Sequence, residues 1–278
     1  MPLPRHPAIH WALVLSLSLI LNACSEDSEV VTNLTGPDRA WGSQSGELAL
    51  DYLQSSAYPN MYMEVDYVVG AEPSEFTRDH GLAEVLSLIQ KTGEVEVSLD
   101  TALQPKGPDY AYSMDEVRQI EEANRSTFTD GDTASMYTLF LDGHHADDTD
   151  TGSILGVSYR GSSLVIFAGT IARICAERTV GVSGPLVDMI CPLAEATVAV
   201  HEVGHMLGLV DNGIAMVADH KDPDHGDHDS DSACIMYWLN NTEDMLDVVR
   251  QRIEAEEGEQ VSPFCEHCLA DMEAARSR

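Results

Sequence analysis

The pentapeptide His201-Glu202-Val203-Gly204-His205 constrains the fold more than any other feature of this sequence. On an α-helix, residues four apart lie on one face, so His201 and His205 can present two imidazoles to one metal ion. Glu202 lies one position round from His201, which puts its carboxylate beside such an ion rather than on it. The sequence therefore first predicts a helix with a metal-binding face.

The residues that follow the pentapeptide predict how this helix ends. Met206 and Leu207 give the helix an apolar side to bury, and Gly208 can end it in a left-handed conformation. Such a turn is expected to swing the chain back so that Asp211 reaches the same metal. Zinc at this site would lower the pKa of water towards ~7 and polarise a carbonyl, and Glu202 would act as general base and then general acid.

These residues resemble a known zinc motif. The pattern His201-Glu202-x-x-His205-x-x-Gly208-x-x-Asp211 is similar to the elongated motif of the metzincin metallopeptidases, and Cys234-Ile235-Met236-Tyr237 resembles their methionine turn. The stretch from Gly204 to Tyr237 also looks like a set of bacterial lipoprotein metalloproteases. The resemblance implies that Met236 forms the floor of the site. It also implies that Tyr237 stabilises the oxyanion or binds the metal.

An insertion between Asp211 and Met236 leaves the third metal ligand open. It is rich in Asp and His, and His220, His225 and His228 are alternatives to Asp211. We take Asp211 as the first choice and His220 as the second, because zinc accepts both carboxylate oxygen and imidazole nitrogen. The aspartates of residues 219–231 can also hold Ca²⁺, although a solvated loop is the simpler interpretation.

The cysteines outside the N-terminal region are odd in number: Cys175, Cys191, Cys234, Cys265 and Cys268. In an exported protein we expect disulfides, and a bond from the Cys265/Cys268 pair to Cys234 is the favoured one. The same cysteines resemble the archaemetzincins, which hold a second, structural zinc. No Cys follows the expected third-ligand position, so a four-thiolate site cannot be assembled.

The N-terminus predicts export. A short apolar run ends in Leu21-Asn22-Ala23-Cys24, which resembles the lipobox of bacterial lipoproteins. Residues 1–23 are thus a signal peptide, and Cys24 is the lipidation site that anchors the chain to a bacterial membrane, on its periplasmic or cell-surface face. An ordinary signal peptide with an incidental Cys is the alternative. Residues 24–60 read as a flexible acidic tether, and residues 61–278 as one zinc metallopeptidase domain.

The charge balance excludes some partners. The chain has 47 acidic and 15 basic residues, for a net charge of −32. Such a surface repels nucleic acid, so we exclude a DNA- or RNA-binding role. We expect a peptide or protein as the substrate. We also expect the chain to be a monomer.

Hydrophobic periodicity predicts an α+β fold of the metzincin type. Strands are expected at 61–69, 94–99, 135–141, 154–159 and 164–168, the last two as a hairpin, and helices at 80–91, 113–125 and 242–257. Together with the motif helix, which Pro192 either opens or kinks, they describe a mixed twisted sheet and a smaller, irregular C-terminal subdomain. The predicted function is that of a zinc endopeptidase. The alternative is a non-catalytic surface lipoprotein that binds a metal or a partner.

Overall fold

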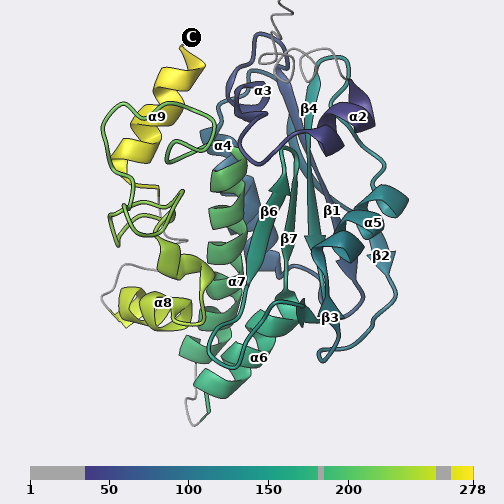
Figure 1. Ribbon diagram of the computed structural model, residues 1–278, viewed down its shortest axis with the longest axis vertical. Coiled ribbons are helices and arrows are strands. Elements are labelled where there is room, and N and C mark those ends of the chain that lie inside the picture. Colours follow the sequence, from purple (N-terminus) through teal and green to yellow (C-terminus); the bar gives the residue numbers. More distant parts are fainter. Residues whose placement is uncertain (1–34, 181–184, 255–263, 278) are drawn as a thin grey trace, which may run out of the picture. The chain divides into compact units, whose positions relative to one another are not determined.

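Five strands form the central sheet of the computed structural model, in the order β2-β1-β4-β7-β6 (Figure 1). β1 pairs in parallel with β2 and β4, and β4 with β7, whereas β6 is antiparallel to β7 and lies at the edge. The strands span Asn60–Val68 (β1), Val95–Leu103 (β2), Thr133–Phe140 (β4), Gly156–Arg160 (β6) and Ser163–Ile166 (β7). The mixed sheet and its β6–β7 hairpin confirm the prediction from periodicity.

Strand register decides which side chains face each layer. Neighbouring residues of a strand point to opposite faces, and paired residues share a face. Glu64, Tyr137 and Ser163 are paired in turn across β1, β4 and β7, so they lie on one face, and Arg160 lies there too because it pairs with Ser163. Gly156 lies on the opposite face.

The helix that carries the motif, α7, spans Pro185–Met206 and packs on the face of Gly156, where a Cβ on that residue would be 3.0 Å from Val198 Cγ1. Pro192 lies inside this helix rather than at its start. The π-helix η1 (Thr77–Leu82) and α4 (Ala83–Leu88) extend this layer. Gly81 of η1 permits the close approach, since a Cβ there would lie 3.1 Å from the Cβ of Ala196.

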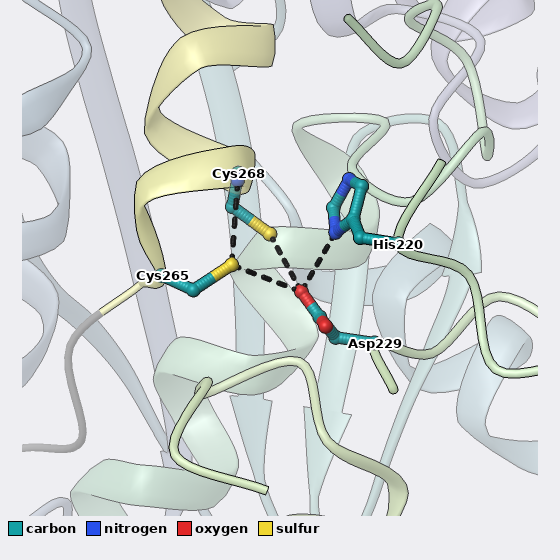
Figure 2. A group of neighbouring side chains, drawn as sticks. All are labelled: His220, Asp229, Cys265 and Cys268. Atoms are coloured by element: carbon teal, nitrogen blue, oxygen red, sulfur yellow. Dashed lines mark hydrogen bonds and ion pairs between the residues drawn. The ribbon is translucent and has the colours of Figure 1, made fainter. Parts of the chain in front are cut away.

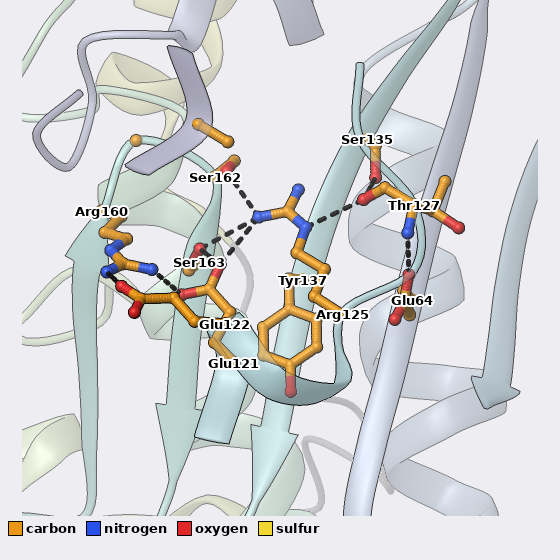
Figure 3. A network of polar contacts seen from close by, with 12 residues as sticks. Glu64, Glu121, Glu122, Arg125, Thr127, Ser135, Tyr137, Arg160, Ser162 and Ser163 are labelled. Atoms are coloured by element: carbon orange, nitrogen blue, oxygen red, sulfur yellow. Dashed lines mark hydrogen bonds and ion pairs between the residues drawn. The ribbon is translucent and has the colours of Figure 1, made fainter. Parts of the chain in front are cut away.

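The other face of the sheet carries α5 (Met114–Asn124), which a buried ion network joins to the β6–β7 hairpin (Figure 3). Arg125 Nη1 donates to Glu121 Oε1 at 2.9 Å, and Arg160 Nη1 donates to Glu121 Oε2 at 2.7 Å. The predicted start of α5 is confirmed, because Ser113 Oγ accepts a hydrogen bond from the Glu116 backbone N–H.

The structure describes residues 35–180, 185–254 and 264–277, all of which belong to the compact unit Leu34–Arg278. The signal peptide and Cys24 lie outside the described residues. Within the stretch where we expected a tether, two helices are folded onto the domain, α2 (Gly36–Gly42) and α3 (Ala49–Leu53). Tyr52 and Leu53 are buried there, and Tyr52 Oη donates to the Gly161 carbonyl at 3.0 Å. The tether prediction is therefore wrong for this part, because the few apolar residues of a polar stretch suffice to bury two short helices.

Several elements were not predicted. They are the two-stranded sheet of β3 (Ala111–Tyr112) and β5 (His144–His145), helix α6 (Ala168–Arg178), the 3-10 helix η2 (Trp238–Asn241) and helix α9 (Glu266–Arg276). The predicted C-terminal helix is present as α8 (Met245–Glu254). Among the described residues, no helix combines the length and apolar character needed to cross a bilayer.

Candidate metal centre

The last turns of α7 hold the two histidines of the motif. His201 is fully buried and His205 is half-buried, and their rings lie edge to face with centroids 4.8 Å apart. Their Nε2 atoms are separated by only 3.1 Å. Two donors of one tetrahedral zinc, each ~2.0–2.1 Å from the ion, are separated by a similar distance, roughly 3.3 Å. The helical spacing therefore brings the two nitrogens together as the sequence predicts.

A third imidazole, that of His228, completes the group. Its ring centroid lies 5.1 Å from that of His201 and 5.0 Å from that of His205. Each of the three residues offers a ring nitrogen within 4.8 Å of the other two. His228 belongs to the Asp/His-rich insertion, so a segment far from α7 in sequence supplies the third donor.

Backbone carbonyls orient two of the three rings. The Nδ1 atom of His201 lies 2.8 Å from the Ile235 carbonyl, and that of His228 lies 2.6 Å from the His225 carbonyl. A carbonyl can only accept, so Nδ1 carries the proton in both rings and Nε2 keeps its lone pair. This arrangement is typical of zinc-binding histidines, whose second nitrogen is held by a carbonyl or carboxylate.

The three rings favour the neutral form, which is the form that binds a metal. Burial, together with the nearby His228, lowers the pKa of His201 to about 3. Burial and the neighbouring imidazoles also lower the pKa of His205 and of His228. A neutral imidazole is the form of histidine that binds a metal ion, so the donor set fits zinc.

The structure does not bring Asp211 to this group. Gly208 ends α7 with φ of +72°, as predicted, but Val210 and Asp211 also adopt left-handed backbone conformations, with φ of +57° and +61°. The chain then turns away, and Asp211 is exposed to solvent. His228 takes the position that we expected Asp211 to occupy.

His220, the second choice, is engaged elsewhere. Its Nδ1 lies 2.8 Å from Asp229 Oδ2 and its Nε2 lies 2.9 Å from Asp271 Oδ2. Burial alone would lower the pKa of His220, but the hydrogen bonds to these two carboxylates outweigh it and raise the pKa. His225 is also outside the group, since its ring is exposed and stacks on Trp238 with centroids 4.2 Å apart.

Met236 lies beneath the motif as the methionine-turn resemblance implies. It is fully buried, and a Cβ on Gly204 would lie 2.2 Å from its sulfur. Only glycine at this position of α7 lets the sulfur approach the helix between the two histidines. Tyr237 precedes η2 with its ring 6.0 Å from that of Trp238, and within the described part of the chain its hydroxyl makes no hydrogen bond to the three histidines.

Glu202 is buried on the side of α7 that faces β6. Burial raises the pKa of its carboxyl to about 8, and a hydrogen bond from the Ser158 backbone opposes this shift. Its Oε1 accepts a hydrogen bond from Asn241 Nδ2 at 2.8 Å. A bound cation next to Glu202 would favour the ionised carboxylate, which is the form that accepts a proton.

A second cluster is built largely from thiols. Figure 2 shows Cys265, Cys268, Asp229 and His220 converging, each with one donor atom within 4.8 Å of the others. Cys265 Sγ lies 3.0 Å and Cys268 Sγ 3.5 Å from Asp229 Oδ2. Cys234 adjoins the cluster, because its sulfur is 3.7 Å from that of Cys268. Three thiols with a carboxylate or an imidazole form a donor set that fits zinc.

This arrangement corrects the prediction about the cysteines. Cys234, Cys265 and Cys268 are free thiols, and the described disulfide instead joins Cys175 of α6 to Cys191 of α7. The prediction rested on an oxidising compartment and on the isolated Cys265-x-x-Cys268 pair, and neither reveals that the fold brings Cys175 and Cys191 together. Asp229, directly after His228, contacts both the Cys265 and the Cys268 thiol.

The alternative of a Ca²⁺ site in the insertion gains no support from the described residues. The acidic side chains of the insertion contact other groups: Asp222 lies 2.9 Å from His225 Nδ1, and Asp227 accepts from Lys221 at 2.7 Å. Of the acidic side chains described in the insertion, Asp229 alone belongs to a group of possible metal ligands, and it contacts the thiols.

The chain is similar to a protein of known structure, although the other comparisons found no match. No protein-family model and no curated protein matches the chain. Among solved structures, the archaemetzincin from Methanopyrus kandleri is similar at 16% sequence identity and a TM-score of 0.45, covering 79% of this chain and 97% of that one.

Proposed function

We propose that the chain is a zinc-dependent endopeptidase. The observation that carries the proposal is the convergence of three imidazoles, from His201, His205 and His228, at the helix that also carries Glu202, the residue next to His201. The resemblance of the motif and of the methionine turn to metzincins supports a peptide as the substrate. His205 and His228 are only half-buried, so a substrate can approach from their side.

In this mechanism the three histidines hold the metal and Glu202 moves protons. Zinc, when bound, supplies Lewis acidity that makes water more acidic and a carbonyl more electrophilic. Glu202 accepts the proton of the attacking water and passes it to the amine that leaves, acting as base and then as acid. Met236 supports the helix beneath the histidines, and the Ile235 and His225 carbonyls keep two rings in the metal-binding tautomer.

We further propose that the thiol cluster holds a second, structural zinc. Cys234, Cys265 and Cys268 would supply sulfur, with Asp229 or His220 as the fourth donor. Cys234, Cys268, Asp229 and His220 are buried, which suits a closed site without room for substrate. If His220 binds through Nδ1, Asp271 still orients its other nitrogen.

For the cellular setting, we propose that the chain is exported and anchored by a lipid on Cys24, on the basis of the N-terminal pattern alone. The alternative function is that of a surface lipoprotein that binds metal without catalysis.

One experiment separates the two functions. Cleavage of a fluorogenic peptide library is measured with the purified full-length chain and with Glu202→Gln, and the zinc content of both is determined. Cleavage that disappears in Glu202→Gln while zinc is retained supports the peptidase. Two bound metal ions without any cleavage by the unmutated chain would support the binding protein.

A further inference from the structure

Asn241, the last residue of η2, bridges the candidate base and the edge strand. Its Nδ2 donates to Glu202 Oε1 at 2.8 Å and to the Gly156 carbonyl at 3.1 Å. Its Oδ1 accepts from the Gly156 backbone N–H at 3.0 Å. One carboxamide thus binds a residue of β6 at two points and the Glu202 carboxylate at a third.

The strand register explains why Gly156 is available for this contact. The Phe167 N–H donates to the Leu155 carbonyl, so that in the antiparallel ladder the polar groups of Gly156 point away from β7. Asn241 satisfies both groups, as a neighbouring strand would. Because Gly156 has no side chain, Glu202 can also approach this residue closely: a Cβ on Gly156 would lie 2.8 Å from Glu202 Cγ.

The segment that carries Asn241 is itself fixed to the methionine turn. Asn240, the preceding residue, is fully buried, and its Nδ2 lies 2.9 Å from the Cys234 carbonyl and 3.0 Å from the Ile235 carbonyl. The Ile235 carbonyl is also the acceptor for His201 Nδ1. The amide of Asn241 is therefore held on a rigid support.

We propose that Asn241 is a positioning residue for the general base: its amide fixes one carboxylate oxygen of Glu202 against the edge of β6. This inference rests on the proposed peptidase function. A buried carboxylate that has lost this side-chain donor can rotate about its side-chain bonds, and a displacement of about 1 Å at a reacting group costs on the order of 10²-fold in rate. Asn241 acts through Glu202 and needs no contact with substrate.

Three substitutions test the role, with kcat, KM and zinc content measured for each. Asn241→Ala is expected to lower kcat on the order of 10²-fold while KM and zinc content stay unchanged. Asn241→Asp keeps an acceptor for the Gly156 N–H but places a second carboxylate where the donor to Glu202 stood, so we expect a lower kcat than in Asn241→Ala. Asn124→Ala, which removes an amide from α5, is the matched control and should leave kcat unchanged.

The order of the two variants decides between positioning of the base and support of the strand. If Asn241 only tied η2 to β6, Asn241→Asp would keep more activity than Asn241→Ala, and that result would overturn the proposal. A kcat that stays normal in Asn241→Ala would overturn it as well. If Asn241→Ala fails to fold, Asn241→Gln replaces it as the reference, and Asn241→Asp must still have the lower kcat.

Failure of this inference is distinct from failure of the proposed function. An unmutated chain that cleaves peptides, together with an inactive Glu202→Gln and a fully active Asn241→Ala, retains the peptidase and removes the role of Asn241. An unmutated chain without cleavage removes both.

Discussion

The histidine group and the thiol cluster are two candidate metal sites built on different principles. The first takes neutral nitrogen donors mainly from one regular element, α7, and two of its rings are half-buried. The second takes sulfur and oxygen from the methionine turn, the insertion and α9, and most of its donors are buried. A catalytic zinc site keeps a position open for water or substrate, whereas a structural one is closed by protein ligands. This difference in exposure is the reason for proposing chemistry at the first group and stabilisation at the second.

The two arrangements meet in the insertion. His228 belongs to one and Asp229, the next residue, belongs to the other. The Asp229 N–H donates to the Met236 carbonyl at 2.9 Å, so the methionine turn fixes the backbone where the two side chains diverge. A metal in the thiol cluster would thus also fix the position of His228.

The largest expected effect is on the third nitrogen donor. His228→Ala should remove one of two bound zinc ions and abolish cleavage, because two histidines alone bind zinc much more weakly than three. Zinc content by atomic emission and cleavage of the peptide library are the measurements. Asp211→Gly is the matched control and should keep both zinc ions and full activity; loss of zinc in that variant would restore Asp211 as the ligand.

Glu202→Gln should separate binding from catalysis at the first group. Because general acid–base catalysis contributes typically about 10²–10⁴-fold, kcat should fall by this factor while both zinc ions remain bound. The readout is kcat with zinc content measured on the same sample. Full activity in Glu202→Gln would remove the base from the mechanism.

Cys268→Ser should affect the second site first. We expect loss of one zinc ion and a free energy of unfolding lower by about 3–4 kcal/mol, the stabilisation from a ligand at 100 to 1,000 times its dissociation constant. Denaturant unfolding and zinc content check this. Cleavage should also become weaker in Cys268→Ser, because loss of this metal would displace His228. Unchanged stability and two bound zinc ions in this variant would mean that the cluster holds no metal.

The disulfide should give the smallest effect. Cys175 and Cys191 are 16 residues apart, and a loop of this size corresponds to about 3 kcal/mol in the chain-entropy model. The double variant Cys175→Ala/Cys191→Ala should lose up to this amount of unfolding free energy and keep both zinc ions. Loss of zinc from the histidine group in that variant would show that the bond also shapes α7.

Local sequence patterns predicted the parts of the site that one regular element builds. The helical spacing of His201 and His205, the adjacent Glu202 and the left-handed Gly208 all follow from the geometry of a single helix. The Ser113 cap and the alternating strands followed in the same way. The helices α2 and α3 were missed because their polar sequence conceals the few apolar residues that bury them, such as Tyr52.

The sequence by itself determined two histidines, a base and a methionine turn, because a short-range period or motif marks each of them. Only the tertiary structure decided that His228 lies with His201 and His205, that His220 lies between Asp229 and Asp271, and that Cys265 and Cys268 contact Asp229 with Cys234 next to them. The insertion offers three histidines with no regular period, so local geometry cannot rank them. The choice depends on contacts with residues far along the chain, and these exist only after the insertion has packed against the methionine turn and α9.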